Sequence, residues 1–70
     1  MVNWQLEARR ILRAELARRD WTYARLVSAL GKIGVEESVR SVTNKLSRGT
    51  YSFAFFLQCM KAMGRANVEI

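Results

Sequence analysis

The sequence has no histidine, no proline and only one cysteine, Cys59. A single cysteine cannot form an intramolecular disulfide, and without histidine too few ligands remain for a structural zinc site. No histidine is present to activate a serine, threonine or cysteine nucleophile, and no phosphate-binding loop or metal-ligand spacing occurs. The sequence therefore predicts a protein that is not an enzyme and has neither a metal nor a cofactor.

Acidic residues are also scarce. Six acids stand against twelve lysines and arginines, which gives a net charge of +6, and no acid occurs between Ser38 and Val68. The isoelectric point is near 10.5. Because this much positive charge on a small domain favours an anionic partner, we expect the chain to bind nucleic acid.

The chain has room for one small domain, residues 1–70, of which half are apolar. A chain of this length buries only about 60% of its unfolded surface, so we expect self-association to add stability. No apolar run approaches the roughly 18 residues of a membrane span, and the first residues do not resemble a signal peptide. These features predict a cytoplasmic protein without a membrane partner.

Hydrophobic periodicity and four glycines divide the chain into four expected helices. These helices cover residues 3–19, 23–30, 37–47 and 53–63. Asn3, Thr22 and Ser52 are the expected N-caps, and Gly49 and Gly64 are the expected ends. Residues 65–70 alternate in polarity, which is typical of a short extended tail. The predicted fold class is all-α.

The helix expected over 37–47 has two contrasting faces. A narrow apolar stripe contains Val39, Val42 and Leu46, and the other side carries short polar residues and cations. Arginine reads guanine edges and asparagine reads adenine edges in the major groove of DNA. The residues predicted to face bases are Arg40, Ser41, Asn44 and Ser47. The residues predicted to hold phosphates are Thr22, Arg25, Lys45, Arg48 and Thr50.

The first expected helix has an acidic residue within its apolar face. Its apolar stripe is predicted to contain Trp4, Ala8, Ile11, Leu12 and Leu16, and Glu15 falls inside this stripe. Because a buried carboxylate needs a cation, we expect Glu15 to contact Arg48, with Arg19 as the other candidate. A solvated position at the edge of the stripe is the alternative. In the turn after the second helix, residues 31–35, either Ile33 or Val35 is expected to be buried.

The helix expected over 53–63 is apolar over most of its circumference, which is more than one buried face requires. Its inward stripe is predicted to contain Phe53, Phe56, Leu57, Met60 and Met63. The apolar side chains outside this stripe, together with the tail, predict a homodimer. The predicted dimer interface contains Phe55, Cys59, Ala62, Val68 and Ile70.

Several short motifs resemble known helix-turn-helix domains. These motifs are Thr22-Tyr23-Ala24, Gly34-Val35-Glu36-Glu37-Ser38, Asn44-Lys45, Ser47-Arg48-Gly49 and Phe55-Phe56-Leu57-Gln58-Cys59. They most closely resemble a small family of bacterial domains of unknown function. A related set resembles the Cro and lambda-repressor class, namely Thr22-Tyr23-Ala24 with Leu26, Gly34-Val35, Asn44 to Gly49 and Leu57 to Gly64. The resemblance implies a four-helix, lambda-repressor-like fold. The chain departs from the larger class in its longer turn from Gly31 to Val35, and in lacking glutamine at the start of the two motif helices.

Composition and resemblance together predict a small prokaryotic or phage transcriptional regulator that binds duplex DNA through the helix at 37–47. The alternative is a protein-interaction module that keeps the helix-turn-helix scaffold but does not bind DNA. Salt dependence separates the two, because DNA binding weakens steeply with salt while apolar assembly does not. A basic first helix lying on anionic lipid is disfavoured, because the core needs its apolar stripe.

Overall fold

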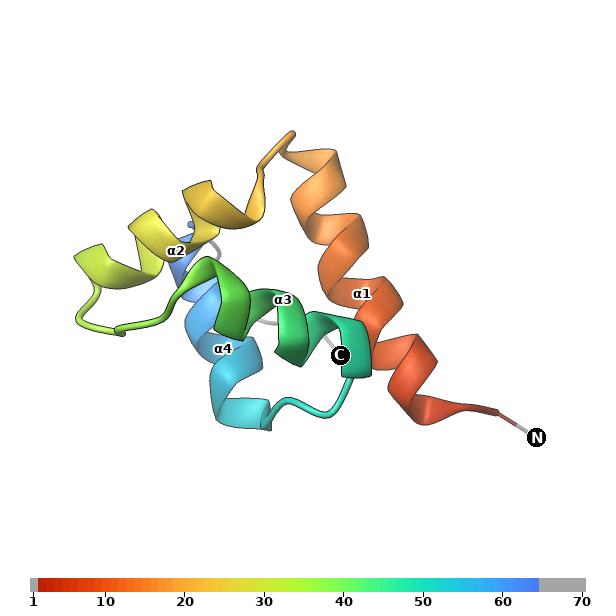
Figure 1. The fold of residues 1–70 in the computed structure, drawn as a ribbon. Helices are drawn as coiled ribbons and strands as arrows, with labels where there is room; N and C mark the ends of the chain where they lie inside the picture. The colour runs from red at the N-terminus through yellow and green to blue at the C-terminus, as the bar shows by residue number, and fades with distance from the viewer. Residues whose placement is uncertain (1, 65–70) are drawn as a thin grey trace.

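The computed structural model describes residues 2–64, and this part of the chain contains four α-helices and no strand. The helices are α1 (Trp4–Arg18), α2 (Tyr23–Lys32), α3 (Val39–Arg48) and α4 (Phe53–Ala62) (Figure 1). The predicted all-α class is confirmed. The predicted tail, with Val68 and Ile70, lies outside the described residues.

Each helix begins at a polar side chain that caps its first turn. The caps are Asn3, Thr22, Ser38 and Ser52, and the side-chain oxygen of each accepts a backbone N–H two or three residues further on. A cap of this kind typically contributes about 1 kcal/mol. The three N-caps predicted from the sequence are confirmed. Because Ser38 caps α3, this helix begins two residues later than the predicted 37–47 range.

The core is built from one buried row on each helix. Its members are Leu12, Leu16, Leu26, Leu30, Val42, Leu46, Phe55, Cys59, Met60 and Met63. α2 packs on both α3 and α4, while α1 packs on α3. Val35 in the α2–α3 loop packs against this core, whereas Ile33 is 39% exposed. Val35 is therefore the residue of that turn that packs inward, and it is half-buried.

The apolar stripe predicted for α1 is too wide. Leu12 and Leu16 are buried, but Trp4 is 75% exposed and Ile11 is 48% exposed. Trp4 is the first residue of α1, and this end of the helix lies at the edge of the fold (Figure 1). Neither side chain belongs to the core cluster or to the residues that pack against it.

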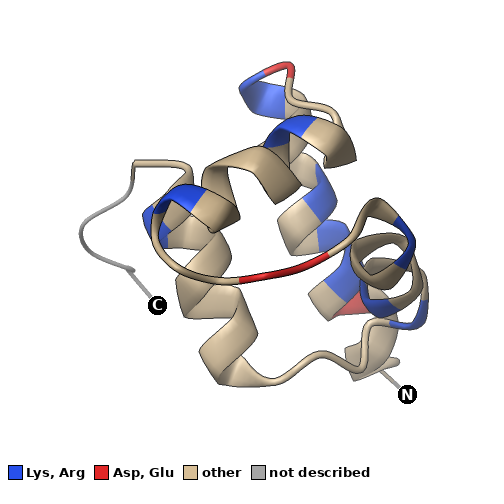
Figure 2. Ribbon diagram, turned by 60° about the vertical axis from the view of Figure 1, so that its left-hand side comes forward, with Lys and Arg blue, Asp and Glu red and all other residues tan. Residues whose placement is uncertain are grey.

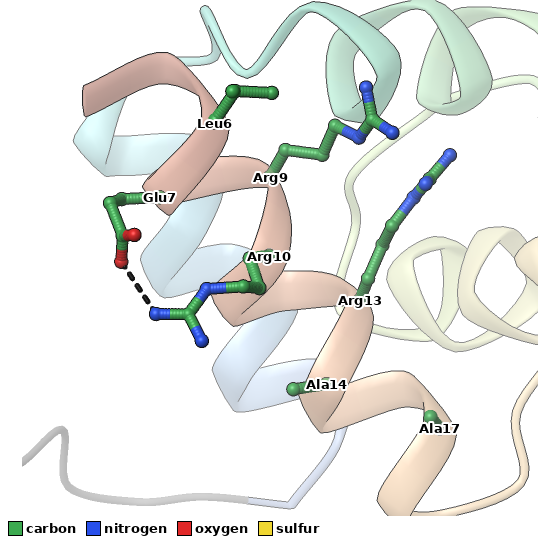
Figure 3. A pocket seen from close by; sticks show the side chains of 7 residues that line it. All are labelled: Leu6, Glu7, Arg9, Arg10, Arg13, Ala14 and Ala17. Carbon is green, nitrogen blue, oxygen red and sulfur yellow. Dashed lines mark hydrogen bonds and ion pairs between the residues drawn. The ribbon is translucent and has the colours of Figure 1, made fainter. Parts of the chain in front are cut away.

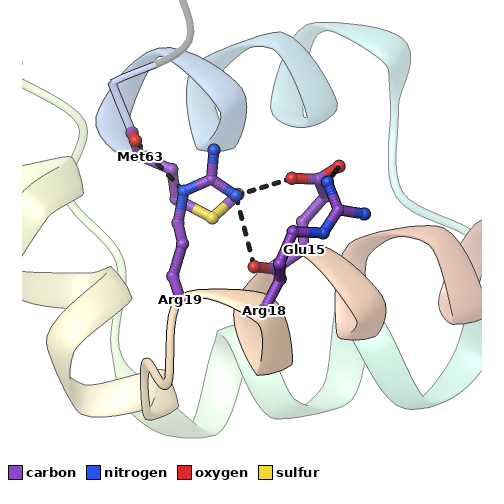
Figure 4. A network of polar contacts seen from close by, with 4 residues as sticks. All are labelled: Glu15, Arg18, Arg19 and Met63. Carbon is purple, nitrogen blue, oxygen red and sulfur yellow. Dashed lines mark hydrogen bonds and ion pairs between the residues drawn. The ribbon is translucent and has the colours of Figure 1, made fainter.

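Glu15 is buried in α1, as predicted, but its predicted contact with Arg48 is wrong. The carboxylate lies 2.6 Å from Nη1 of Arg19 and 3.3 Å from Nη1 of Arg18 (Figure 4). Arg48 is exposed at the end of α3. The local i,i+4 spacing brings Arg19 to Glu15 without any help from tertiary structure, which explains why the nearer arginine is the partner.

The predicted inward face of α4 is correct only in part, because Met60 and Met63 are buried and Phe56 packs against the core, but the other two predicted members are exposed. Phe55 and Cys59 are buried, at 4% and 0% exposure, while Phe53 and Leu57 are 62% and 40% exposed. With apolar residues on nearly every side, the periodicity of α4 did not determine its rotation. The ring of Phe55 packs edge-on against Tyr51, with 5.7 Å between ring centroids. Phe55 and Cys59 are thus covered within their own chain, and the dimer interface predicted there is wrong.

Ala62, the third predicted interface residue of α4, is half-buried and packs against the same core. It therefore contributes to the core of its own chain.

Gly49 brings the end of α3 directly against α1. Its φ is +66°, and a Cβ atom placed there would lie 1.9 Å from the carbonyl oxygen of Gln5. Glycine is thus required both by the left-handed conformation and by the close approach of two backbones. The contact fixes the C-terminus of α3 next to the first turn of α1.

Candidate nucleic-acid interface

The outer face of α3 carries four exposed polar side chains, namely Arg40, Asn44, Ser47 and Arg48. Val42 and Leu46 are fully buried on the opposite side and hold this face outward. Among residues 2–64, none of the four side chains makes a hydrogen bond or ion pair. Their donors and acceptors are therefore available to a ligand.

Two other predicted contacts, Ser41 and Lys45, are half-buried and bind Glu37. The Ser41 hydroxyl donates to Oε1 of Glu37 at 2.8 Å, and Nζ of Lys45 donates to Oε2 at 2.6 Å. The Lys45 ammonium also lies 4.6 Å from the centroid of the Phe55 ring. Its hydrogen bond to Glu37 holds the pKa of that carboxyl below its ordinary value. The side chains of Ser41 and Lys45 are therefore engaged by Glu37, unlike those of Arg40 and Asn44.

The remaining predicted phosphate contacts are dispersed. Thr22 uses its hydroxyl oxygen to accept the backbone N–H of Arg25 and so caps α2. The Arg25 guanidinium stacks on the Trp21 ring at 4.7 Å, in a shallow pocket of about 330 Å³ that includes Ala62 of α4. Arg25 thus lies beside α4. Thr50 is exposed directly after the end of α3.

Two arginines of α1 form a basic feature outside the residues predicted to contact DNA. Arg9 and Arg13 extend to the same side of α1, toward the ribbons of α2 and α3, whereas Arg10 turns away to pair with Glu7 (Figure 3). A groove of about 610 Å³ runs along this part of the helix, with Ala14 among its lining residues. The i,i+4 spacing of two arginines without an intervening acid was the available signal.

The aromatic residues near the turns mainly close the core. Trp21, Tyr23 and Tyr51 are half-buried and pack against the core residues. The Tyr51 hydroxyl donates to the carbonyl oxygen of Ala8, and burial raises the pKa of Tyr51 to about 12. The Tyr23 hydroxyl instead accepts a hydrogen bond from Nε of Arg13 at 3.3 Å. Tyr23 thus connects α2 to Arg13, one of the two arginines that extend from α1 toward α2 and α3.

A family model described as a domain of unknown function (DUF6471) matches residues 4–68, which include all four helices. The chain belongs to this family. The predicted membership of a small domain family of unknown function is confirmed, whereas the relationship to the Cro and lambda-repressor class stays a prediction. No curated protein and no solved structure matches the chain.

Basic residues are distributed over every helix of this family member, while acids are few. Lysines and arginines occur on all four helices, and the α2–α3 loop carries two consecutive acids, Glu36 and Glu37 (Figure 2). Three of the acids are paired, because Glu7 contacts Arg10, Glu15 contacts Arg18 and Arg19, and Glu37 contacts Lys45. The cations of residues 2–64 outside these pairs occur on every helix, with Arg9 and Arg13 on α1, Arg25 and Lys32 on α2, Arg40 and Arg48 on α3, and Lys61 on α4.

Residues 2–64 contain neither a membrane-spanning helix nor a metal-binding group of side chains. No helix there has the length and apolar character needed to cross a membrane. The same residues contain no group of three or more histidine, cysteine or acidic side chains placed to hold a metal ion.

Proposed function

We propose that the chain binds duplex DNA in a sequence-specific manner through α3, as a small transcriptional regulator in a prokaryotic or phage cytoplasm. In this proposal α2, the following turn and α3 act as a lambda-repressor-like helix-turn-helix. The observation that supports it most strongly is the exposed, acid-free face of α3, formed by Arg40, Asn44, Ser47 and Arg48. The same face stands opposite two fully buried core residues, so its direction is fixed by packing.

The chemistry of this face suits base recognition. The Asn44 amide can donate to N7 and accept from N6 of an adenine through paired hydrogen-bonding groups, and the Arg40 guanidinium can donate to O6 and N7 of a guanine. An α-helix with its side chains is about 10–12 Å in diameter, which fits a major groove about 12 Å wide, and the ten residues of α3 would extend about 15 Å along it. Ser47 would extend this base-facing surface, and Arg48, at the C-terminal end, would reach a flanking phosphate.

The direct test is a selection from random duplexes at two salt concentrations. We expect one sequence class to be enriched, with an affinity that falls steeply as salt rises. The variant Arg40→Ala/Asn44→Ala should enrich no class. Lys61→Ala is the control, because it removes one positive charge from an exposed position on α4. If no duplex is retained by the native chain at either salt concentration, the proposed function is wrong.

Self-assembly is the second candidate function, and one observation favours it. Phe53 and Leu57 are exposed on α4, and the Phe53 ring stacks on Phe56 with 6.1 Å between centroids. A second copy of the chain is the partner that this surface would serve, in place of the buried Phe55. Sedimentation of the native chain and of Phe53→Ser at micromolar concentration tests it. A native monomer would exclude this candidate.

A further inference from the structure

Two arginines on α1 place like charges close together on one side of the helix, and this placement does not stabilise the fold. Arg9 and Arg13 are four residues apart on the same side of the helix (Figure 3). Like charges at this spacing destabilise a helix by about 0.2–0.5 kcal/mol. The other arginines of α1 are compensated, because Arg10 pairs with Glu7 and Arg18 pairs with Glu15. Arg9 and Arg13 lie outside the ion pairs of residues 2–64.

The position of the pair connects it to both elements of the proposed DNA-binding unit. Arg9 is one helical turn from Gln5, whose backbone lies against Gly49 at the end of α3. Arg13 contacts Tyr23, in the first turn of α2. The two guanidinium groups therefore lie on the side of α1 that joins the end of α3 to the start of α2.

A duplex that takes α3 into its major groove presents phosphate-lined walls on both sides of that helix. We infer that Arg9 and Arg13 bind backbone phosphates on one of these walls, and that Tyr23 positions Arg13 for this contact. The inference rests on the proposed function and extends the interface from α3 to α1. The ligand is a phosphodiester, so these contacts add affinity but no base preference.

Tyr23 has a specific part in this arrangement. Its hydroxyl oxygen accepts a hydrogen bond from Nε of Arg13 at 3.3 Å. This contact uses the inner nitrogen and leaves the two terminal nitrogens, Nη1 and Nη2, to bind two phosphate oxygens. Such paired guanidinium–phosphate contacts are stronger and more directional than a single ammonium contact. The Tyr23 hydroxyl hydrogen remains able to donate to the same phosphate.

The test compares charge-matched variants by fluorescence anisotropy on the duplex selected by the native chain, over a range of salt. Arg9→Gln/Arg13→Gln removes the proposed phosphate contacts. Arg10→Gln/Lys61→Gln removes the same charge from exposed positions elsewhere. We expect the first variant to bind roughly tenfold more weakly at low salt and to lower the salt slope by about 0.9 for each phosphate that it no longer neutralises. The control should keep more of both the affinity and the slope, and neither variant should change the preferred sequence.

A double-mutant cycle tests the positioning role of Tyr23. Tyr23→Phe removes only the hydroxyl group, so a purely structural role would affect binding equally with or without Arg13. We expect Tyr23→Phe to weaken binding in the native background and to have little effect beside Arg13→Gln. Equal effects in both backgrounds would overturn the positioning role.

The outcomes also separate this inference from the proposed function. If the native chain binds and Arg40→Ala/Asn44→Ala abolishes the preference, but Arg9→Gln/Arg13→Gln behaves like its charge control, only the inference is wrong. If the native chain binds no duplex, both are overturned.

Discussion

Glu15 and Arg19 form a partly buried ion pair that connects the end of α1 to the end of α4. Nη1 of Arg19 lies 2.6 Å from Oε2 of Glu15, and Nε of the same guanidinium donates to the carbonyl oxygen of Met63 at 3.3 Å (Figure 4). The side chains are 9% and 24% exposed. One arginine thus compensates a buried charge and also satisfies a carbonyl at the C-terminus of another helix.

Replacing Glu15 should measure the strength of this connection. We expect Glu15→Gln to lower the free energy of unfolding by about 1–3 kcal/mol, because it leaves Arg19 near Met63 without its carboxylate. For a domain of this size, each kcal/mol shifts the melting temperature by roughly 4–8 °C. Arg48→Ala is the control and should melt like the native chain. If Arg48→Ala destabilised the chain and Glu15→Gln did not, the assignment of Arg19 as the partner of Glu15 would be wrong.

The approach of α3 to α1 gives a second stability prediction. Gly49→Ala should cost more than about 3 kcal/mol, because a Cβ atom would strike the Gln5 backbone and alanine would also adopt a left-handed φ. Gly34→Ala is the matched control. Gly34 has a φ of +84° but open space around it, so the change should cost only about 1–2 kcal/mol. Chemical denaturation of both variants checks the difference, and equal costs would mean that the backbone contact has no energetic role.

Local signals in the sequence were sufficient to predict the helices. Capping by Asn3, Thr22 and Ser52 and termination of α3 at Gly49 depend on neighbouring backbone groups, so the residues themselves specify them. The rotation of α4 depends on which of its many apolar residues meets the core. Phe55 was therefore assigned to the surface although it packs against Tyr51.

The candidate site shows the same division. The outward direction of Arg40 and Asn44 follows from helical periodicity against Val42 and Leu46. The engagement of Lys45 depends on Glu37, eight residues away and outside the helix, and no periodicity indicates that contact. The position of Arg13 beside Tyr23 depends on how α1 and α2 cross, which the sequence pattern does not encode directly.

The network around Glu37 should make stability depend on pH. Lys45, and secondly Ser41, stabilise the ionised carboxylate and hold its pKa below the ordinary value of 4.5. Since the folded state binds this proton more weakly than the unfolded state, the contribution is present above pH 4.5 and is lost as pH falls. Lys45 is 37% exposed, so we expect less than about 1 kcal/mol. Melting temperatures of the native chain and Glu37→Gln should differ at pH 7 and converge toward pH 3, whereas a constant difference would exclude the ion pair as the cause.

The thiol of Cys59 should be unreactive while the chain is folded. Its side chain is fully buried, and burial raises the pKa of the thiol to about 12. Because the thiolate is the reactive form, alkylation at pH 8 should require unfolding. Mass spectrometry after iodoacetamide treatment, with and without denaturant, measures this. Rapid alkylation of the native chain would mean that α4 does not shield Cys59.

The most direct measurement of the central claim is the binding preference of Asn44→Ala. The affinities of the native chain and of this variant are measured for the selected duplex and for a scrambled duplex of equal length, at the same salt concentration. We expect the preference for the selected duplex to fall by about 1–3 kcal/mol, while affinity for the scrambled duplex and the melting temperature stay unchanged. A variant that keeps the full native preference would contradict the claim that the Arg40–Asn44 face of α3 reads DNA.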